Sequence, residues 1–268
     1  MVKKSMTRID KTLKSLDRPA LVTFITAGDP NHEQSLNVLK ALPDAGADII
    51  ELGMPFTDPM ADGPVIDLAS QRALKGGANM HKTLDMVREF RKTNDNTPLI
   101  LMGYTNPIHI YGMNKFCEDA AQAGVDGLII VDLPPEESHD LELAVQKSQL
   151  NLIRLVTPTT DEARLDKLLN GAGGFLYYVS ITGVTGSKKA DLSQIEPHIA
   201  SIKKQSNMPV AIGFGIKTPE DAKNFGAIGD AVVVGSAIVQ TIADNGHDPQ
   251  LADKVATQVK ALSDALKA

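Results

Sequence analysis

Two carboxylates lie close together in a stretch of sequence whose residue types suit proton transfer. Glu51 ends the apolar run Asp48-Ile49-Ile50, and Asp62 follows in chain rich in proline and glycine. Because burying an ionised carboxylate without a partner is costly, we expect Glu51 at the mouth of a strand, partly desolvated, able to carry and give up a proton. Asp62, in a loop, is free to be aimed at a second group of a substrate. Two carboxylates in different environments suit proton-assisted cleavage of a C–C or C–O bond.

Simpler interpretations exist for these acidic residues. A structural ion pair is the alternative for Glu51, and a turn-forming role is the alternative for Asp62. For Asp58, which lies in the same loop, we prefer the turn-forming role.

Short apolar runs that alternate with amphipathic helical stretches would position these residues. Eight runs are predicted to be strands, at residues 20–26, 48–53, 98–104, 127–132, 151–157, 174–180, 209–215 and 230–236. Continuous apolar runs such as Leu128-Ile129-Ile130-Val131 are typical of a parallel sheet that is buried on both faces. Strands that alternate with helices indicate right-handed βαβ units.

Eight such units in 268 residues predict a single (β/α)8 TIM barrel, in the α/β class. We expect one domain over residues 1–268, with an extra N-terminal helix in residues 1–17 and the barrel in residues 18–268. An open doubly wound sheet is the alternative, although that fold usually has fewer strands. Because barrel enzymes react at the C-terminal ends of their strands, the polar residues there predict an active site. These residues are Thr26, Glu51, Tyr104, Asp132, Thr157, Ser180, Gly215 and Ser236.

Glycines at the ends of the last two predicted strands indicate a phosphate site. Gly213 and Gly215 end the seventh strand, and Gly235 and Ser236 end the eighth. Glycine lets the backbone approach a ligand, and the N–H groups at the start of a helix bind anions. The Ser236 hydroxyl is expected to add a donor and to cap the next helix. Packing glycines and a simple helix cap are the alternative interpretation. Residues 181–190, rich in small side chains, are predicted to form a lid over a phosphorylated substrate.

An apolar slot suited to a flat aromatic ligand is predicted at the same rim. Each of its residues, taken alone, is more often part of a core. They are Phe24, Met102, Ile129, Leu155, Tyr177, Phe214 and Val233.

Several functional classes are disfavoured by the composition. The net charge of −6 argues against a nucleic-acid surface, and no apolar run is long enough to cross a bilayer. One cysteine, Cys117, fits a reducing compartment, so a cytoplasmic location is expected. No metal site is expected, because the six histidines lack the spacing of metal ligands. No lysine stands at a strand end as a candidate for a Schiff base, which argues against a covalent aldolase.

The chain resembles the family of tryptophan synthase alpha chains. The segment from Ile50 to Ile66 closely resembles the family signature, and shorter similar motifs before and after it occur in the same order as in the family, from about residue 7 to the C-terminus. They are Phe24-Ile25-Thr26-Ala27-Gly28-Asp29-Pro30, Asn106-Pro107-Ile108, Asp132-Leu133-Pro134-Pro135-Glu136-Glu137, Gly183-Val184-Thr185-Gly186, Gly213-Phe214-Gly215-Ile216 and Gly235-Ser236-Ala237-Ile238-Val239.

The resemblance implies retro-aldol cleavage of indole-3-glycerol phosphate to indole and glyceraldehyde 3-phosphate. It implies that Glu51 protonates the departing indole carbon and handles the substrate hydroxyl proton, while Asp62 accepts the indole N–H. Tyr177, Phe24 and Thr185 would contact the indole. The implied phosphate ligands are Gly186, Gly215, Gly235 and Ser236.

The resemblance also implies a partner, a beta chain that joins indole to serine in an α2β2 heterotetramer. No cofactor is expected in this chain, because pyridoxal phosphate belongs to the beta chain. A partner that covers the loop after Glu51 would explain its apolar side chains, which we expect to be exposed. They are Met54, Pro55, Phe56, Pro59 and Met60. A catalytically weak subunit, a stand-alone lyase and another phosphate-binding barrel such as an isomerase remain alternatives.

Overall fold

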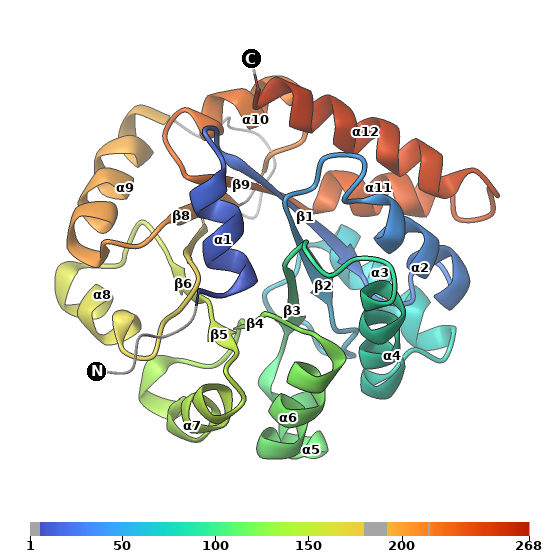
Figure 1. Ribbon diagram of the computed structural model, residues 1–268, viewed down its shortest axis with the longest axis horizontal. Helices are drawn as coiled ribbons and strands as arrows, with labels where there is room; N and C mark the ends of the chain where they lie inside the picture. The colour runs from blue at the N-terminus through green and yellow to red at the C-terminus, as the bar shows by residue number, and fades with distance from the viewer. Residues whose placement is uncertain (1–5, 180–191, 214, 268) are drawn as a thin grey trace.

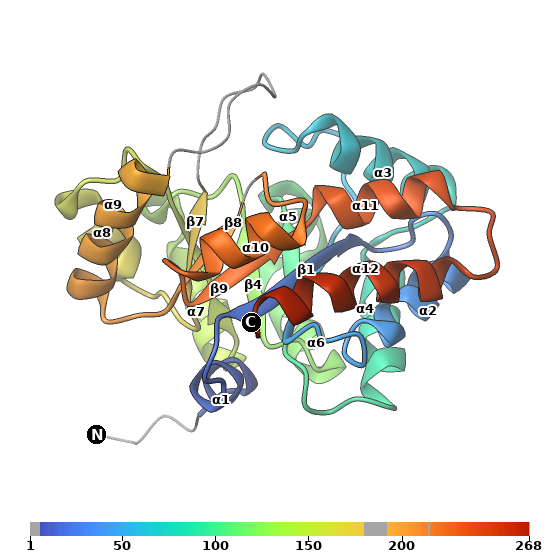
Figure 2. The same cartoon turned by 90° about the horizontal axis from the view of Figure 1, so that it is seen from above.

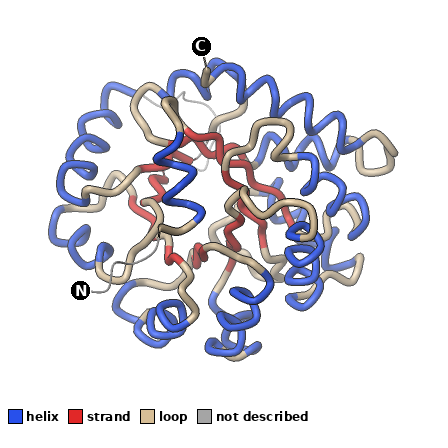
Figure 3. Tube along the Cα trace, in the orientation of Figure 1, coloured by secondary structure: helices blue, strands red, loops and turns tan. Residues whose placement is uncertain are grey.

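The structure, a computed structural model, describes residues 6–179, 192–213 and 215–267. In these ranges the strands form an inner ring and the helices surround it (Figures 1 and 3). The strands are β1 (Ala20–Thr26), β2 (Ile49–Gly53), β3 (Leu99–Gly103), β4 (Gly127–Ile130), β5 (Asn151–Leu152), β6 (Arg154–Val156), β7 (Leu176–Val179), β8 (Val210–Gly213) and β9 (Ala231–Val234). The helices are α1 (Arg8–Ser15), α2 (His32–Ala41), α3 (Pro64–Lys75), α4 (Met80–Arg91), α5 (Thr105–Tyr111), α6 (Met113–Ala123), α7 (His139–Lys147), α8 (Glu162–Leu169), α9 (Leu192–Ser206), α10 (Pro219–Gly226), α11 (Ser236–Asp244) and α12 (Leu251–Ala265), with a short 3-10 helix η1 (Pro135–Glu137).

The strands form one parallel sheet that closes into a barrel. Their order is β5-β4-β3-β2-β1-β9-β8-β7-β6, and every neighbouring pair is parallel. The first and last strands of this order, β5 and β6, are two pieces of the fifth predicted strand, interrupted only at Ile153. The predicted (β/α)8 barrel is therefore confirmed, and the open doubly wound sheet was the wrong alternative.

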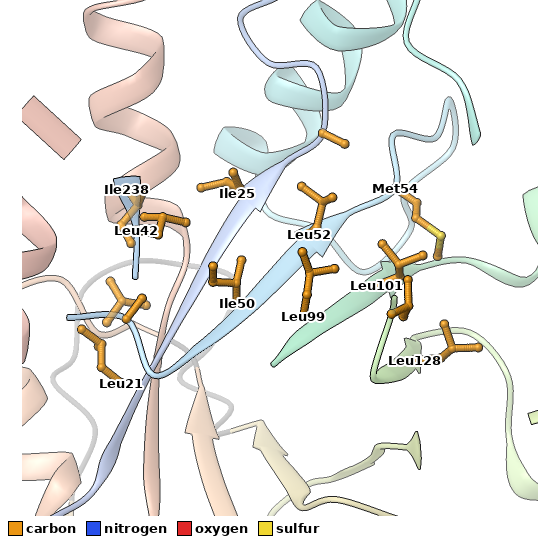
Figure 4. Packing of buried hydrophobic residues seen from close by; sticks show 14 of the residues in the cluster. Leu21, Ile25, Leu42, Ile50, Leu52, Met54, Leu99, Leu101, Leu128 and Ile238 are labelled. Atoms are coloured by element: carbon orange, nitrogen blue, oxygen red, sulfur yellow. The ribbon is translucent and has the colours of Figure 1, made fainter. Parts of the chain in front are cut away.

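Side chains alternate between the inside of the barrel and the layer beneath the helices, as strand geometry requires. Figure 4 shows part of the outer layer, in which Ile50 and Leu52 of β2 pack beside Leu99 and Leu101 of β3. The barrel interior has its own apolar cluster. Its buried members are Ile9, Ala20, Val22, Ile49, Ile100, Ile129, Ile153, Phe175, Tyr177, Ala211, Ala231 and Val233.

Helix α1 closes the N-terminal end of the barrel, as Figures 1 and 2 show. Thr7 and Asp10 form a capping box at its start. Its Ile9 is fully buried in the interior cluster, and Arg8 forms an ion pair with Asp126, Nη1 to Oδ1 at 2.9 Å. In Figure 2, α1 and α3 lie on opposite sides of the molecule. The opposite end, where the strands finish, is therefore the end that is left for an active site.

Several strands are shorter than predicted at their C-terminal ends. Tyr104 and Ser236, predicted as the last residues of strands, lie at the N-cap of α5 and at the first position of α11. Asp132 and Thr157 also lie beyond the observed strands. None of these four residues is part of a strand, because the chain turns at each of them into the following loop or helix.

Candidate active site

Glu51 is deeply buried inside the barrel. It lies in the middle of β2, its side chain is on the same side of the strand as interior Ile49, and it is 0% exposed. Neither carboxylate oxygen has a hydrogen-bond partner among the described residues. Glu51 is thus more buried than the strand-mouth position that was expected from the sequence.

Burial changes the acidity of Glu51. Desolvation raises the pKa of its carboxyl from 4.5 to about 8. At neutral pH the side chain is therefore mostly a neutral carboxylic acid, which lowers the cost of keeping it in the barrel. Burial raises the pKa of the Tyr177 hydroxyl, and the nearby charge of Glu51 adds to this rise. Glu51 is thus a proton donor aimed into the barrel, with an aromatic ring beside it.

Because Glu51 is buried, we expect Glu51→Gln to have a higher free energy of unfolding than the wild type at high pH. The Glu51 carboxyl has a pKa of about 8 in the folded state and an ordinary value of 4.5. Between pH 4.5 and pH 8 it is therefore protonated in the folded protein and ionised in the unfolded protein. The wild-type free energy of unfolding therefore falls as pH rises through that window, while glutamine carries no such penalty.

We expect Glu51→Gln and the wild type to differ little near pH 4.5. By pH 9 the variant should be more stable by on the order of a few kcal/mol. Urea unfolding of both proteins at pH 5, 7 and 9 measures the difference. A difference that does not change with pH would contradict the raised pKa.

Asp62 lies in the loop that follows the same strand. Its N–H donates to the carbonyl of Pro59 at 3.2 Å, and the next two residues, Gly63 and Pro64, are the N-cap and the first residue of α3. Burial raises the pKa of the Asp62 carboxyl to about 6, and the charge of Asp67 adds to this rise, whereas a hydrogen bond from Tyr104 lowers it. Asp62 is therefore largely ionised at neutral pH and accepts a proton more readily than an ordinary aspartate.

Tyr104, one of the polar residues predicted at the strand ends, contacts the Asp62 loop, although the sequence assigned it no particular role. Its hydroxyl accepts a hydrogen bond from the Ala61 N–H at 3.1 Å and is close enough to the Asp62 carboxyl to lower the pKa of that group. The residue is only 3% exposed, and its ring lies 5.4 Å from that of Phe56. Tyr104 thus fixes the loop that carries Asp62 from the neighbouring strand. The signal available in the sequence was its place at the end of the strand after that of Glu51.

The apolar residues predicted for the slot converge inside the barrel where the structure describes them. Ile129, Tyr177 and Val233 belong to the interior cluster, against which Met102 and Leu155 pack. Phe24 forms a small cluster with Ala69 of α3 and Val239 of α11, and Met102 also packs there. Two further predicted contacts, Phe214 and Thr185, lie outside the described residues.

Glycines at the strand ends make room for the two aromatic rings of this slot. A Cβ on Gly213 would lie 2.3 Å from the hydroxyl oxygen of Tyr177. A Cβ on Gly53 would lie 2.6 Å from Cζ of Phe24. A side chain at either glycine would require an aromatic ring to move, which favours packing as the role of Gly213, one of its two alternative interpretations.

The N-terminus of α11 is the part of the predicted phosphate site that the structure describes best. The cap is Gly235, which has no side-chain cap hydrogen bond, so the prediction that Ser236 caps this helix was wrong. The Ile238 and Val239 N–H groups donate to the Gly235 carbonyl at 2.9 and 3.0 Å. The earlier N–H groups of the first turn are directed out of the helix, where they suit an anion.

Gly215 and Gly186 complete the predicted phosphate ligands. Gly215 has a φ of +79°, a conformation that favours glycine. Gly186 lies outside the described residues, as does the predicted lid at residues 181–190.

A parallel barrel with one acidic group in the middle of β2 and a second on the loop that follows has the architecture of a (β/α)8-barrel enzyme. The family model described as tryptophan synthase alpha chain matches residues 11–267. The chain therefore belongs to the tryptophan synthase alpha chain family. The known role of this family is the cleavage of indole-3-glycerol phosphate, so the chain is a carbon–carbon lyase. The family partners a beta chain.

Solved structures agree with this assignment. A tryptophan synthase alpha chain from Legionella pneumophila subsp. pneumophila is 40% identical, with a TM-score of 0.90 over 98% of each chain. A structure from Aquifex aeolicus VF5 is 34% identical, with a TM-score of 0.89 over 97% of this chain and 99% of the other. Tryptophan synthase from M. tuberculosis, in an open form with BRD0059 bound, is 29% identical, with a TM-score of 0.87 over 98% and 100% of the two chains.

The described ranges contain twelve α-helices and one short 3-10 helix. None of them combines the length with the apolar character that crossing a bilayer requires.

Proposed function

We propose that Glu51 and Asp62 carry out the cleavage of indole-3-glycerol phosphate within a single barrel domain. The observation that carries the proposal is the pair itself, a buried carboxyl on β2 with a pKa of about 8 and a second carboxyl on the following loop with a pKa of about 6. One group is a proton donor and the other a proton acceptor at the same pH. Such a separation of pKa values supports a division into acid and base.

The reaction then runs in two proton-balanced steps. In the first, the Glu51 carboxylic acid gives its proton to C3 of the indole while the Asp62 carboxylate accepts the N–H proton, which leaves a neutral C=N tautomer. In the second, the Glu51 carboxylate takes the proton of the substrate hydroxyl next to C3 as the C–C bond breaks. The electron pair of that bond moves into the ring, the ring nitrogen regains a proton from Asp62, and the hydroxyl carbon becomes the aldehyde. Both carboxyl groups end in their starting states.

We propose that the remaining predicted residues bind the two ends of the substrate. The indole would lie among the apolar residues Phe24, Met102, Ile129, Leu155, Tyr177 and Val233, with Phe214 and Thr185 as further contacts. The phosphate would bind at the N-terminus of α11, to Gly235 and Ser236, together with Gly215 and Gly186. The uncapped first turn of α11 and the positive φ of Gly215 support this second assignment.

We propose that a beta chain binds at the same end of the barrel in an α2β2 heterotetramer and carries the pyridoxal phosphate, in the cytoplasm. Exposed apolar side chains follow β2 and β3, where Met60 is 84%, Leu68 52% and Ile110 77% exposed. Grouped exposed apolar residues are typical of a partner surface. Met54, which was expected to contribute, is only 5% exposed and does not.

The test is the release of indole from indole-3-glycerol phosphate by the purified chain, alone and with a tryptophan synthase beta chain. We expect slow release alone and a strong increase with the partner. The beta chain alone, with the same substrate, is the control. Fast release without the partner would support the stand-alone lyase, and no release in either case would refute the assignment of Glu51 and Asp62.

A further inference from the structure

A bidentate ion pair connects α3 to the turn that follows β1. The guanidinium of Arg72 donates from Nε to Oδ1 of Asp29 at 2.8 Å and from Nη2 to Oδ2 at 2.9 Å. The Asp29 side chain is fully buried, while that of Arg72 is 35% exposed. Two parallel hydrogen bonds fix orientation as well as distance, which a single contact does not.

The two ends of this pair lie on chain segments that continue from the strand beside Glu51 and from the loop of Asp62. Asp29 lies three residues beyond Thr26, the last residue of β1, and β1 pairs with β2 so that Phe24 is opposite Glu51. On the other side, Arg72 belongs to α3, which begins at Pro64, two residues after Asp62. The pair thus links the strand beside Glu51 to the helix that continues from Asp62.

The turn that holds Asp29 is itself fixed to the barrel. The Asp29 N–H donates to the Thr26 carbonyl at 3.2 Å, and the Gly28 N–H donates to the Ser35 hydroxyl at 3.0 Å. A Cβ on Gly28 would lie 3.0 Å from Cβ of Ala78, in the segment just after α3. Asp29 is therefore a rigid anchor, against which α3 is held at close range.

The other contacts of α3 are less directional. Its Ala69 is buried against Phe24 and Val239, and apolar contacts of this kind depend little on orientation. Within the described ranges, the Asp29–Arg72 pair is the one ion pair or side-chain hydrogen bond that joins α3 to another element. This pair is therefore the directional contact between α3 and the turn after β1.

We propose that Asp29 and Arg72 are positioning residues that hold Asp62 in register with Glu51. The inference rests on the proposed function, because it assigns to the pair an effect on Asp62. Neither residue contacts the substrate in this scheme. Their contribution is to keep the acceptor carboxylate of the loop at its working distance from the donor carboxyl of β2.

Arg72→Lys is the first variant to test. Lysine keeps the charge but lacks the planar fork, so it cannot make both hydrogen bonds at once. We expect kcat to fall by about tenfold, since displacements of about 1 Å far from the chemistry have large effects on rate. KM should change little, because the apolar slot and the phosphate site are intact. Thermal unfolding and circular dichroism confirm that the rate refers to folded protein.

A double-mutant cycle with Asp62→Asn separates positioning from a merely structural role. If Arg72 acts through Asp62, then Arg72→Lys changes kcat by less than about twofold in the Asp62→Asn background. An equal fall in kcat in both backgrounds would overturn the inference, as would wild-type kcat in Arg72→Lys alone. If Asp62→Asn alone keeps wild-type turnover, the proposed role of Asp62 fails, and the inference fails with it.

Two further variants complete the test, one as a control and one as a replacement. Arg88→Lys, in the exposed pair with Asp85 on α4, is the matched control and should keep wild-type kcat. If Arg72→Lys does not fold, the double variant Asp29→Asn with Arg72→Gln replaces it, because it leaves no buried charge unpaired. The same cycle with Asp62→Asn then applies, with the same expected and contradicting results.

Discussion

Glu51→Gln is expected to lower kcat for cleavage of indole-3-glycerol phosphate by at least about a hundredfold, the lower range for loss of general acid–base catalysis. Glutamine has nearly the same shape as a protonated glutamate, so it fits the same space in β2. It has no carboxyl proton to give to C3 of the indole and no basic oxygen to take the hydroxyl proton. Both proposed steps are therefore lost together, while the apolar slot and the phosphate site are unchanged.

The measurement is steady-state indole release by the variant with the beta chain present. KM should stay near the wild-type value, because the interaction that is removed acts in the transition state. Glu89→Gln, on the exposed surface of α4, is the control for the loss of a carboxylate and should keep wild-type turnover. Near-wild-type turnover in Glu51→Gln would remove Glu51 from the mechanism.

The same substitution is expected to raise the free energy of unfolding above about pH 5, because glutamine carries no charge that must be buried. Stability and activity therefore change in opposite directions at one residue. A group that only supported the fold would lose stability when replaced. The two measurements together distinguish a catalytic carboxyl, kept in a costly environment, from a structural one.

The barrel could be predicted from the sequence because buried parallel strands are continuous apolar runs, and these runs remain recognisable without a structure. Glu51 could be proposed as a catalytic group for a related reason, since a carboxylate at the end of such a run is unusual in a core, and Asp62 was proposed from its place in the loop that follows. Strand boundaries were less predictable. At Tyr104 and Ser236 the chain turns into a helix, and the apolar pattern does not show where the ladder of hydrogen bonds ends.

What could not be predicted depends on contacts between residues that are far apart in the chain. Tyr104 is 43 residues from Ala61, the N–H of which it binds, and Asp29 and Arg72 are also 43 residues apart. Met54 was expected at the surface, but it is buried against β3. Its methyl group lies 2.7 Å from the position that a Cβ on Gly103 would occupy. Each of these contacts forms only when β1, β2 and β3 are side by side, so local sequence patterns carry no record of it.

The second large effect is expected for Asp62, and it concerns pH as well as rate. In the proposed first step Asp62 must be ionised to accept the N–H proton, so activity is lost as pH falls below about 6. Glu51 must be protonated to give its proton, so activity is lost as pH rises above about 8. The profile of kcat/KM against pH should therefore be bell-shaped, with its maximum near pH 7.

Asp62→Asn is expected to lower kcat by at least about a hundredfold and to remove the enzyme's acidic limb from the profile. The alkaline limb should remain, since it belongs to Glu51. A complication is that a phosphate monoester also ionises near pH 6, so the substrate itself can produce an acidic limb. An acidic limb that persists unchanged in Asp62→Asn would assign it to the substrate phosphate and contradict the assignment to Asp62.

Tyr104→Phe distinguishes these two sources without removing the carboxylate. The Tyr104 hydroxyl lowers the pKa of the Asp62 carboxyl, so loss of this hydroxyl should move the acidic limb to higher pH. The pKa of the substrate phosphate is independent of Tyr104, and a limb that belongs to the substrate would not move. An upward shift in Tyr104→Phe, with loss of the limb in Asp62→Asn, would therefore identify Asp62 as the group that titrates. It would also establish that the pKa of the base is set by the residue that follows β3, the strand next to the one that carries the acid.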